Sequence, residues 1–183
     1  GSVYVGAFKD GKKHGKGTYK DEHHEIVGEW TDGIINPDGQ RTEIYTDPDD
    51  PKSNSTYVGE FKHDLYHGHG TLTYGDGSVY VGEFSGSDFS HGTMTYADGS
   101  EYVGGWENGI WHGQGTMTYV DGRKFDGGWN EGKRKGQGIL TLKNGKMFDA
   151  IFSNGIFGNG IYKFGNILDV WDGILFWYYK IID

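Results

Sequence analysis

The sequence predicts an all-β protein, namely an elongated single-layer antiparallel sheet of tandem β-hairpins. Three observations lead to this fold class. A motif of about 23 residues recurs along the chain of 183 residues, which indicates a repeat architecture. Inside each copy, apolar and polar residues alternate with a period of two, as strands require. Glycine supplies 34 residues, well above its usual share of about 7%.

About seven copies of the motif start at residues 4, 26, 57, 80, 102, 125 and 148, and a degenerate copy starts near residue 167. The starts are 22 or 23 residues apart, except for a step of 31 after the second copy and one of 19 before the last. The long step holds all three prolines and predicts an insert loop over 36–56. The chain therefore divides into a repeat array over 1–160 and a degenerate terminal repeat over 161–183, which is either a cap or a dimer contact.

Each copy is expected to form one β-hairpin. In the third copy, Tyr57 and Phe61 share one face of the first strand, and Leu72 and Tyr74 share one face of the second. Turns that contain Asp-Gly or Asn-Gly join each hairpin to the next.

These turns fix the register between hairpins. A three-residue loop over 97–99, with Gly99 in the left-handed conformation, keeps all rings on one face of the sheet. The same register pairs Met94 with Tyr102 and places rings opposite glycines, as in Gly113 opposite Trp129. Since glycine leaves room for the ring, this pairing explains the glycine excess.

The rings are predicted to form an exposed apolar stripe, because no amphipathic helix is available to cover them. A stripe of this size is typical of an interaction surface. With strands about 4.8 Å apart, seven hairpins extend for roughly 70 Å. The predicted partner-binding residues are Tyr57, Phe61, Leu72, Tyr74, Tyr80, Phe84, Met94, Tyr96, Tyr102, Trp106, Met117, Tyr119, Phe125 and Trp129.

The unit Tyr-x-Gly-x-Phe/Trp-x-x-Gly-x-x-His-Gly-x-Gly-Thr-x-Thr-Tyr-x-Asp-Gly resembles the MORN repeat (membrane occupation and recognition nexus). The resemblance is most specific over 57–160, good over 4–35 and weak over 161–183. The pattern departs at Ile26, Lys135 and Phe157, and Asn36-Pro-Asp-Gly39 replaces the usual His-Gly-x-Gly. The resemblance implies the same sheet of hairpins, and scaffolding at membranes, the cytoskeleton and junctions.

The function that we expect is that of a non-enzymatic scaffold. It binds a protein or peptide partner, either an apolar segment or a second copy of the array in a homodimer, through the aromatic stripe. Residues 61–122 carry a net charge of −7, so the partner is expected to have basic flanks. The expected location is the cytoplasm, peripheral to a membrane or the cytoskeleton.

The alternative function is a tether to anionic phospholipid such as a phosphoinositide, which the family name suggests. Residues 123–146 carry +5, and the candidate lipid-binding residues are Arg123, Lys124, Lys133, Arg134 and Lys135. Five basic residues at about 1 kcal/mol each give weak, salt-sensitive binding. The total charge of −9 opposes a membrane approach and disfavours nucleic acid as a partner.

Catalytic, cofactor and metal sites are not predicted. The chain has no cysteine, which excludes thiol chemistry and disulfides and favours an intracellular location. Histidines recur in the repeat loops, but repeats about 10 Å apart do not bring successive imidazoles to one metal ion. No pair of carboxylates is predicted to lie in a cleft.

Overall fold

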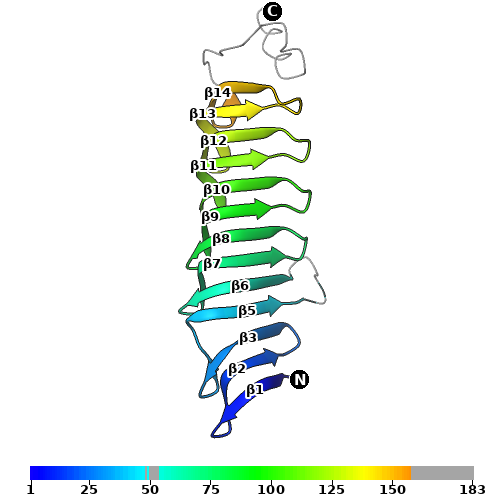
Figure 1. The fold of residues 1–183 in the computed structure, drawn as a ribbon, viewed down its shortest axis with the longest axis vertical. Coiled ribbons are helices and arrows are strands. Elements are labelled where there is room, and N and C mark those ends of the chain that lie inside the picture. Colours follow the sequence, from blue (N-terminus) through cyan, green and yellow to red (C-terminus); the bar gives the residue numbers. More distant parts are fainter. Residues whose placement is uncertain (48, 50–53, 158–183) are drawn as a thin grey trace, which may run out of the picture.

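The structure is a computed structural model and describes residues 1–47, 49 and 54–157. The described residues form a single open antiparallel sheet of 15 strands without a helix. The strands lie across the long axis of the molecule and follow one another in sequence order (Figure 1). The predicted fold class, an elongated sheet of tandem hairpins, is confirmed.

The strands have the following bounds: β1 Val3–Lys9, β2 Lys12–Lys20, β3 His24–Thr31, β4 Ile34–Ile35, β5 Gly39–Tyr45, β6 Ser55–Lys62, β7 Leu65–Tyr74, β8 Val79–Ser85, β9 Asp88–Thr95, β10 Glu101–Glu107, β11 Ile110–Thr118, β12 Lys124–Asn130, β13 Lys133–Thr141, β14 Met147–Ser153 and β15 Ile156–Phe157. Each strand pairs with the next along the chain, except that β3 pairs with both β4 and β5.

Two kinds of turn alternate along the sheet. The turns within hairpins have two central residues with positive φ, as at Asn108 (51°) and Gly109 (72°), which is the geometry that suits a two-residue hairpin. Four loops between hairpins, over 75–77, 97–99, 120–122 and 143–145, have three residues. In one of them the Tyr96 N–H donates to the Ser100 carbonyl at 2.9 Å, and Gly99 has a φ of 87°. The predicted three-residue loop is confirmed.

The predicted register is confirmed as well. Met94 pairs with Tyr102 across β9 and β10, and Gly113 pairs with Trp129 across β11 and β12. Rings from consecutive hairpins therefore lie on one face of the sheet, called the inner face below. The opposite, outer face carries alternating Val and Thr.

Each complete hairpin bends sharply in its middle. In β6 and β7, Gly59 pairs with Gly70 and Phe61 pairs with Tyr66, so one residue of β6 opposes three residues of β7. A bulge of this kind bends the strands. The ring centroids of Tyr57 and Phe61 are only 5.1 Å apart, although four residues of straight strand span about 13 Å.

The bend overturns the prediction that the rings are exposed. The hairpin tip folds over the ring that precedes the bulge, so the rings bury one another. Tyr57, Tyr80, Tyr102 and Phe125 are fully buried. The period of two assigns residues to a face, but it does not say whether the strand runs straight. A single bent layer of strands therefore builds its own core.

The predicted insert loop over 36–56 is shorter than expected, because residues 39–45 form β5, which pairs with β3 and β6. This strand keeps the sheet continuous across the long step between repeats. The predicted terminal repeat over 161–183 lies outside the described residues.

Candidate functional site: the inner aromatic face

The structure divides the predicted partner-binding residues into two groups. Eleven are buried in the core: Tyr57, Phe61, Leu72, Tyr80, Phe84, Met94, Tyr102, Trp106, Met117, Phe125 and Trp129. The other three, Tyr74, Tyr96 and Tyr119, are partly buried and pack against that core. Of the predicted partner-binding residues, only the second group therefore keeps part of its surface accessible on the inner face.

The core repeats one ring arrangement from hairpin to hairpin. The ring of Tyr80 stacks on Phe89, with centroids 3.9 Å apart, and meets Phe84 and Trp106 edge-on at 5.1 and 5.8 Å. Tyr57 and Tyr102 make the same set of contacts in their own copies. Each such pair contributes about 0.5–1.5 kcal/mol beyond the area that it buries.

The buried tyrosine hydroxyls bind the backbone at the bulge. The hydroxyls of Tyr57, Tyr80 and Tyr102 each donate to the carbonyl three residues further on, at 2.9–3.0 Å. Burial raises the pKa of each of these three hydroxyls to about 12, because a buried phenolate loses its hydration.

Sequence reasoning missed three rings of the inner face: Tyr66, Phe89 and Trp111. Each stands nine residues after the first ring of its repeat, and this constant offset was the signal that would have found them. Together with Tyr74, Tyr96 and Tyr119 they form a row of half-buried rings along the core. The row is joined internally, since Trp111 Nε1 donates to the Tyr96 hydroxyl at 2.8 Å.

Arg134, a predicted lipid-binding residue, takes the place of such a ring in the sixth copy. Its guanidinium lies 4.9 Å from the ring centroid of Phe125 and 5.2 Å from that of Phe152. It also donates to the Tyr119 hydroxyl at 2.5 Å. These contacts give Arg134 a structural role in the core.

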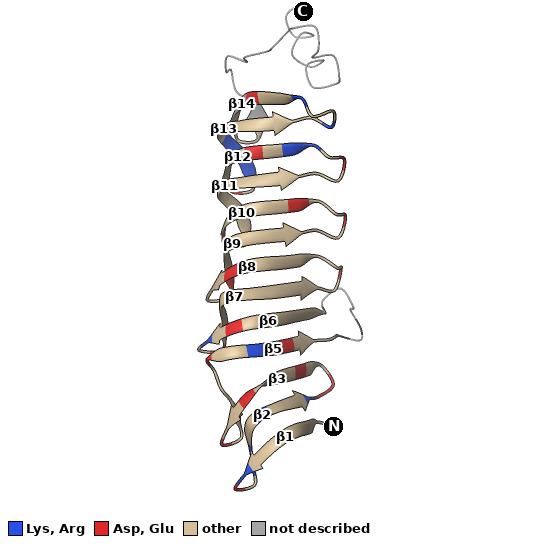
Figure 2. Ribbon diagram, viewed as in Figure 1, with Lys and Arg blue, Asp and Glu red and all other residues tan. Residues whose placement is uncertain are grey.

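The other predicted lipid-binding residues fall into two separate places. Arg123 and Lys124 lie where β12 begins, and Lys124 pairs with Thr141 at the end of β13. Lys133 and Lys135 lie at the other end of this hairpin, as the basic segments of Figure 2 show. Arg123 is also paired with Asp121, with 2.7 Å between Nε and Oδ2. The structure therefore does not bring the five cations into one cluster.

The second copy of the repeat departs from the ring arrangement. Arg41 of β5 is buried and lies 3.7 Å from the ring centroid of Phe61. It makes ion pairs with Glu43 at 2.8 Å and with Asp64 at 3.0 Å. A charged cluster thus occupies the inner face where other copies have apolar residues.

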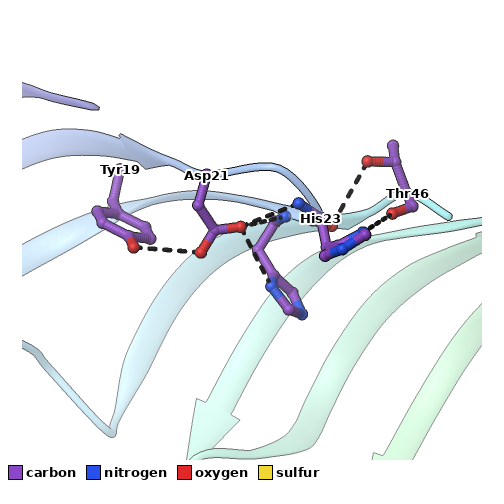
Figure 3. Close-up of polar contacts among 5 residues, drawn as sticks. Tyr19, Asp21, His23 and Thr46 are labelled. Atoms are coloured by element: carbon purple, nitrogen blue, oxygen red, sulfur yellow. Dashed lines mark hydrogen bonds and ion pairs between the residues drawn. The ribbon is translucent and has the colours of Figure 1, made fainter. Parts of the chain in front are cut away.

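The loop before β3 is organised by Asp21 (Figure 3). Its carboxylate accepts hydrogen bonds from the N–H groups of His23 and His24, at 3.0 and 2.8 Å, and from the Tyr19 hydroxyl at 3.1 Å. These donors, the backbone N–H groups first, lower the pKa of Asp21. The N–H of Thr46 donates to the His23 carbonyl at 2.8 Å, which ties this loop to the chain that follows β5.

The described residues contain neither a candidate metal site nor a candidate membrane span. No group of three or more His, Cys, Asp or Glu side chains in that part of the chain is arranged to hold a metal ion. The same residues include no helix with the length and apolarity of a membrane span.

A comparison with protein families identifies the repeat. A family model described as the MORN repeat matches residues 4–22, 57–79, 80–101, 102–122 and 125–147, which together exceed half of the chain. The second copy, with its charged cluster, lies outside these matches. No curated protein matches the chain.

Proposed function

Because the chain belongs to the MORN-repeat family, whose repeats are generally non-catalytic, we propose that it is a scaffold that binds a protein partner along the inner face. The partner is an extended or helical segment with apolar side chains and basic flanks. It lies along the row of half-buried rings Tyr66, Tyr74, Phe89, Tyr96, Trp111 and Tyr119.

The half-buried rings carry this proposal. Each packs on the core with one side and keeps another side accessible, so the ring is held in one orientation before the partner arrives. Tyrosine and tryptophan in such positions give a large contact area at a low cost in side-chain entropy. The tyrosine hydroxyls add hydrogen bonds at the rim of the contact.

The charge distribution favours a basic segment over a second copy of the chain. Residues 61–122 hold eight carboxylates and one lysine, and the acidic residues are distributed between the turns and the strands (Figure 2). Two such acidic arrays repel each other, whereas a basic flank is attracted.

The phospholipid alternative is supported less well by the arrangement of the cations. Arg134 is engaged with Phe125 and Tyr119, and Arg123 with Asp121. The exposed lysines that remain are divided between two ends of a hairpin. Binding to an anionic surface at about 1 kcal/mol per cation needs more of them on one side.

The test uses a library of displayed peptides, selected on the purified protein. We expect the selected peptides to be apolar with basic flanks, and to bind the variant Y74S/Y96S/Y119S at least ten-fold more weakly. Equal affinity in this variant, with an unchanged circular dichroism spectrum, would contradict the proposal.

The matched control is V58T/V81T/V103T, which removes apolar area from the outer face, where these valines are 39–52% exposed. It is expected to bind the same peptides unchanged. Flotation with vesicles that contain a phosphoinositide, at low and physiological salt, tests the alternative. Flotation at physiological salt that K133Q/K135Q abolishes would favour the lipid function instead.

A further inference from the structure

In the second copy, the row of core residues on the inner face has different types of side chain from those in the other copies. From β6 onward the row alternates rings with Leu or Met, as in Tyr57, Leu72 and Tyr80. In β3 and β5 the same row holds Ile26 and Glu43, which pair with each other. An aliphatic side chain and a carboxylate therefore stand where the other copies place a ring and an apolar side chain.

A cavity of about 290 Å³ opens at this place, between β3, β5 and β6. Its walls include Ile26, Glu43, Tyr45, Ser55 and the ring of Tyr66. This volume offers room for one long side chain. The cavity thus coincides with the position where the ring of the repeat is missing.

The rim of the cavity is already ordered. His24 lines it, and its N–H donates to Asp21 at 2.8 Å while its Nδ1 lies 3.5 Å from the same carboxylate. The imidazole also contacts the ring of Tyr45, with centroids 5.3 Å apart. Figure 3 shows the hydrogen bonds by which Asp21 holds this loop.

The lining of the cavity includes one carboxylate, that of Glu43. Arg41 is shared between Glu43 and Asp64, so one guanidinium faces two carboxylates. Burial first, and then the charge of Glu43, raise the pKa of the Tyr66 hydroxyl, whereas the charge of Arg41 lowers it. Residues 25–60 carry a net charge of −7 in the sequence. Among the described residues that line the cavity, none is Lys or Arg.

The inner face holds three cations of the chain itself against its rings, and one of them, Arg41, is the ion-pair partner of Glu43. Lys13 Nζ lies 4.1 Å from the ring centroid of Tyr19 and 4.5 Å from that of Trp30. Arg41 and Arg134 lie over Phe61 and Phe125 in the same way. A cation held against an aromatic ring is therefore a recurrent feature of this face, and such contacts are worth about 0.5–2 kcal/mol.

From this geometry we infer that the cavity binds a lysine or arginine side chain of the protein partner. Glu43 is its counter-ion, and Tyr45 and Tyr66 provide the aromatic walls. The inference rests on the proposed function, because a partner that lies along the inner face passes over the cavity. The cavity sets the register of that partner along the inner face, since one basic side chain enters at one fixed position.

The test uses N-acetyl-arginine amide as the probe and N-acetyl-citrulline amide, its neutral isostere, as the comparison. In NMR titrations we expect the arginine compound to shift the ring signals of Tyr45 and Tyr66 in a saturable way, and to bind at least five-fold more tightly than the citrulline compound.

Two variants test the residues of the cavity. Glu43→Gln removes the counter-ion, and Ile26→Tyr fills the cavity without a change of charge. Each is expected to weaken binding at least five-fold. The control Glu83→Gln changes the net charge equally on the outer face and leaves binding unchanged.

Two results would overturn the inference. One is equal binding of the arginine and citrulline compounds, and the other is wild-type affinity in both the Glu43 and the Ile26 variant. The proposed function fails by a different result, namely wild-type peptide affinity in the triple tyrosine variant. The two failures are therefore distinguishable.

Discussion

Three tryptophans stand at the same position in their repeats, and they differ in one hydrogen bond. Nε1 of Trp30 donates to the Gly17 carbonyl, and Nε1 of Trp129 donates to the Gly115 carbonyl, at 3.2 and 2.8 Å. Nε1 of Trp106 is buried and has no acceptor among the described residues. The bulge in β9, the strand that precedes the one with Trp106, has two residues. The bulges in β2 and β11, which precede the strands with Trp30 and Trp129, have three. We attribute the missing bond to this shorter bulge, which changes how the carbonyls are presented.

The first prediction compares these indoles. Trp129→Phe removes a satisfied donor, whereas Trp106→Phe removes an unsatisfied one, whose burial costs about 1–3 kcal/mol. We expect Trp129→Phe to lower the free energy of unfolding by about 1–2 kcal/mol more than Trp106→Phe. Urea unfolding followed by circular dichroism measures both variants, and equal losses would show that the Trp106 N–H is satisfied in solution.

The second prediction concerns alkaline pH. The pKa of Tyr57, Tyr80 and Tyr102 is about 12 in the folded protein and about 10 in the unfolded chain. The raised pKa contributes stability that is fully present below pH 10 and is lost as the pH rises toward 12. Each hydroxyl accounts for about 1.4 kcal/mol per pH unit in this range.

The measurement is urea unfolding between pH 9 and 12. Tyr57→Phe is the matched control, because it removes one of the titrating groups and should reduce the slope by about 1.4 kcal/mol per pH unit. A stability that stays constant between pH 10 and 12 would contradict the assignment.

The bent hairpin is the element that gives this fold its core. Gly104 and Gly115 pair at the bulge of β10 and β11, and the ring of Tyr102 lies against both of them. The sequence pattern predicted that rings lie over glycines, and it predicted the register between hairpins correctly. It did not predict the bend, because one extra pair of residues in one strand leaves the period-two pattern intact on either side.

The third prediction tests this close packing. A Cβ added at Gly115 would contact the hydroxyl and ring of Tyr102, so we expect Gly115→Ala to destabilise the protein by about 1–3 kcal/mol. The exposed neighbour Gln114→Ala is the control and should cost less than about 0.5 kcal/mol. In a Tyr102→Leu background the Gly115 substitution should cost less, because the contact is gone. An equal cost in both backgrounds would exclude the ring as its cause.

At the scale of the whole molecule, the array is a linear stack in which each hairpin contacts its neighbours. The continuous core cluster runs from Tyr57 to Phe152, and the buried Trp30 lies outside it. The charged cluster of Arg41 stands between the two parts. In stacked repeats the stability of the whole depends on such interfaces between neighbours.

The fourth prediction concerns this junction. Arg41→Ala removes the guanidinium that pairs with Glu43 and Asp64 and covers Phe61. We expect amide hydrogen exchange in β1–β3 to become at least ten-fold faster, while exchange in β8–β12 stays unchanged. Arg123→Ala, at an exposed ion pair, should alter neither region. Faster exchange along the whole sheet would show that the array unfolds as one unit.

The sequence by itself determined the repeat, the strands, the three-residue loops and the register, because the side-chain period of two and the positions of Gly and Asp act locally. It also determined which residues share the inner face, except for Tyr66, Phe89 and Trp111. Only the tertiary structure decided which of them are accessible. The bulges fold each hairpin over its own rings, so Tyr80 is buried whereas Tyr96 remains at the surface. The cavity beside Glu43 likewise depends on how the side chains of β3, β5 and β6 pack, which the period of two does not describe.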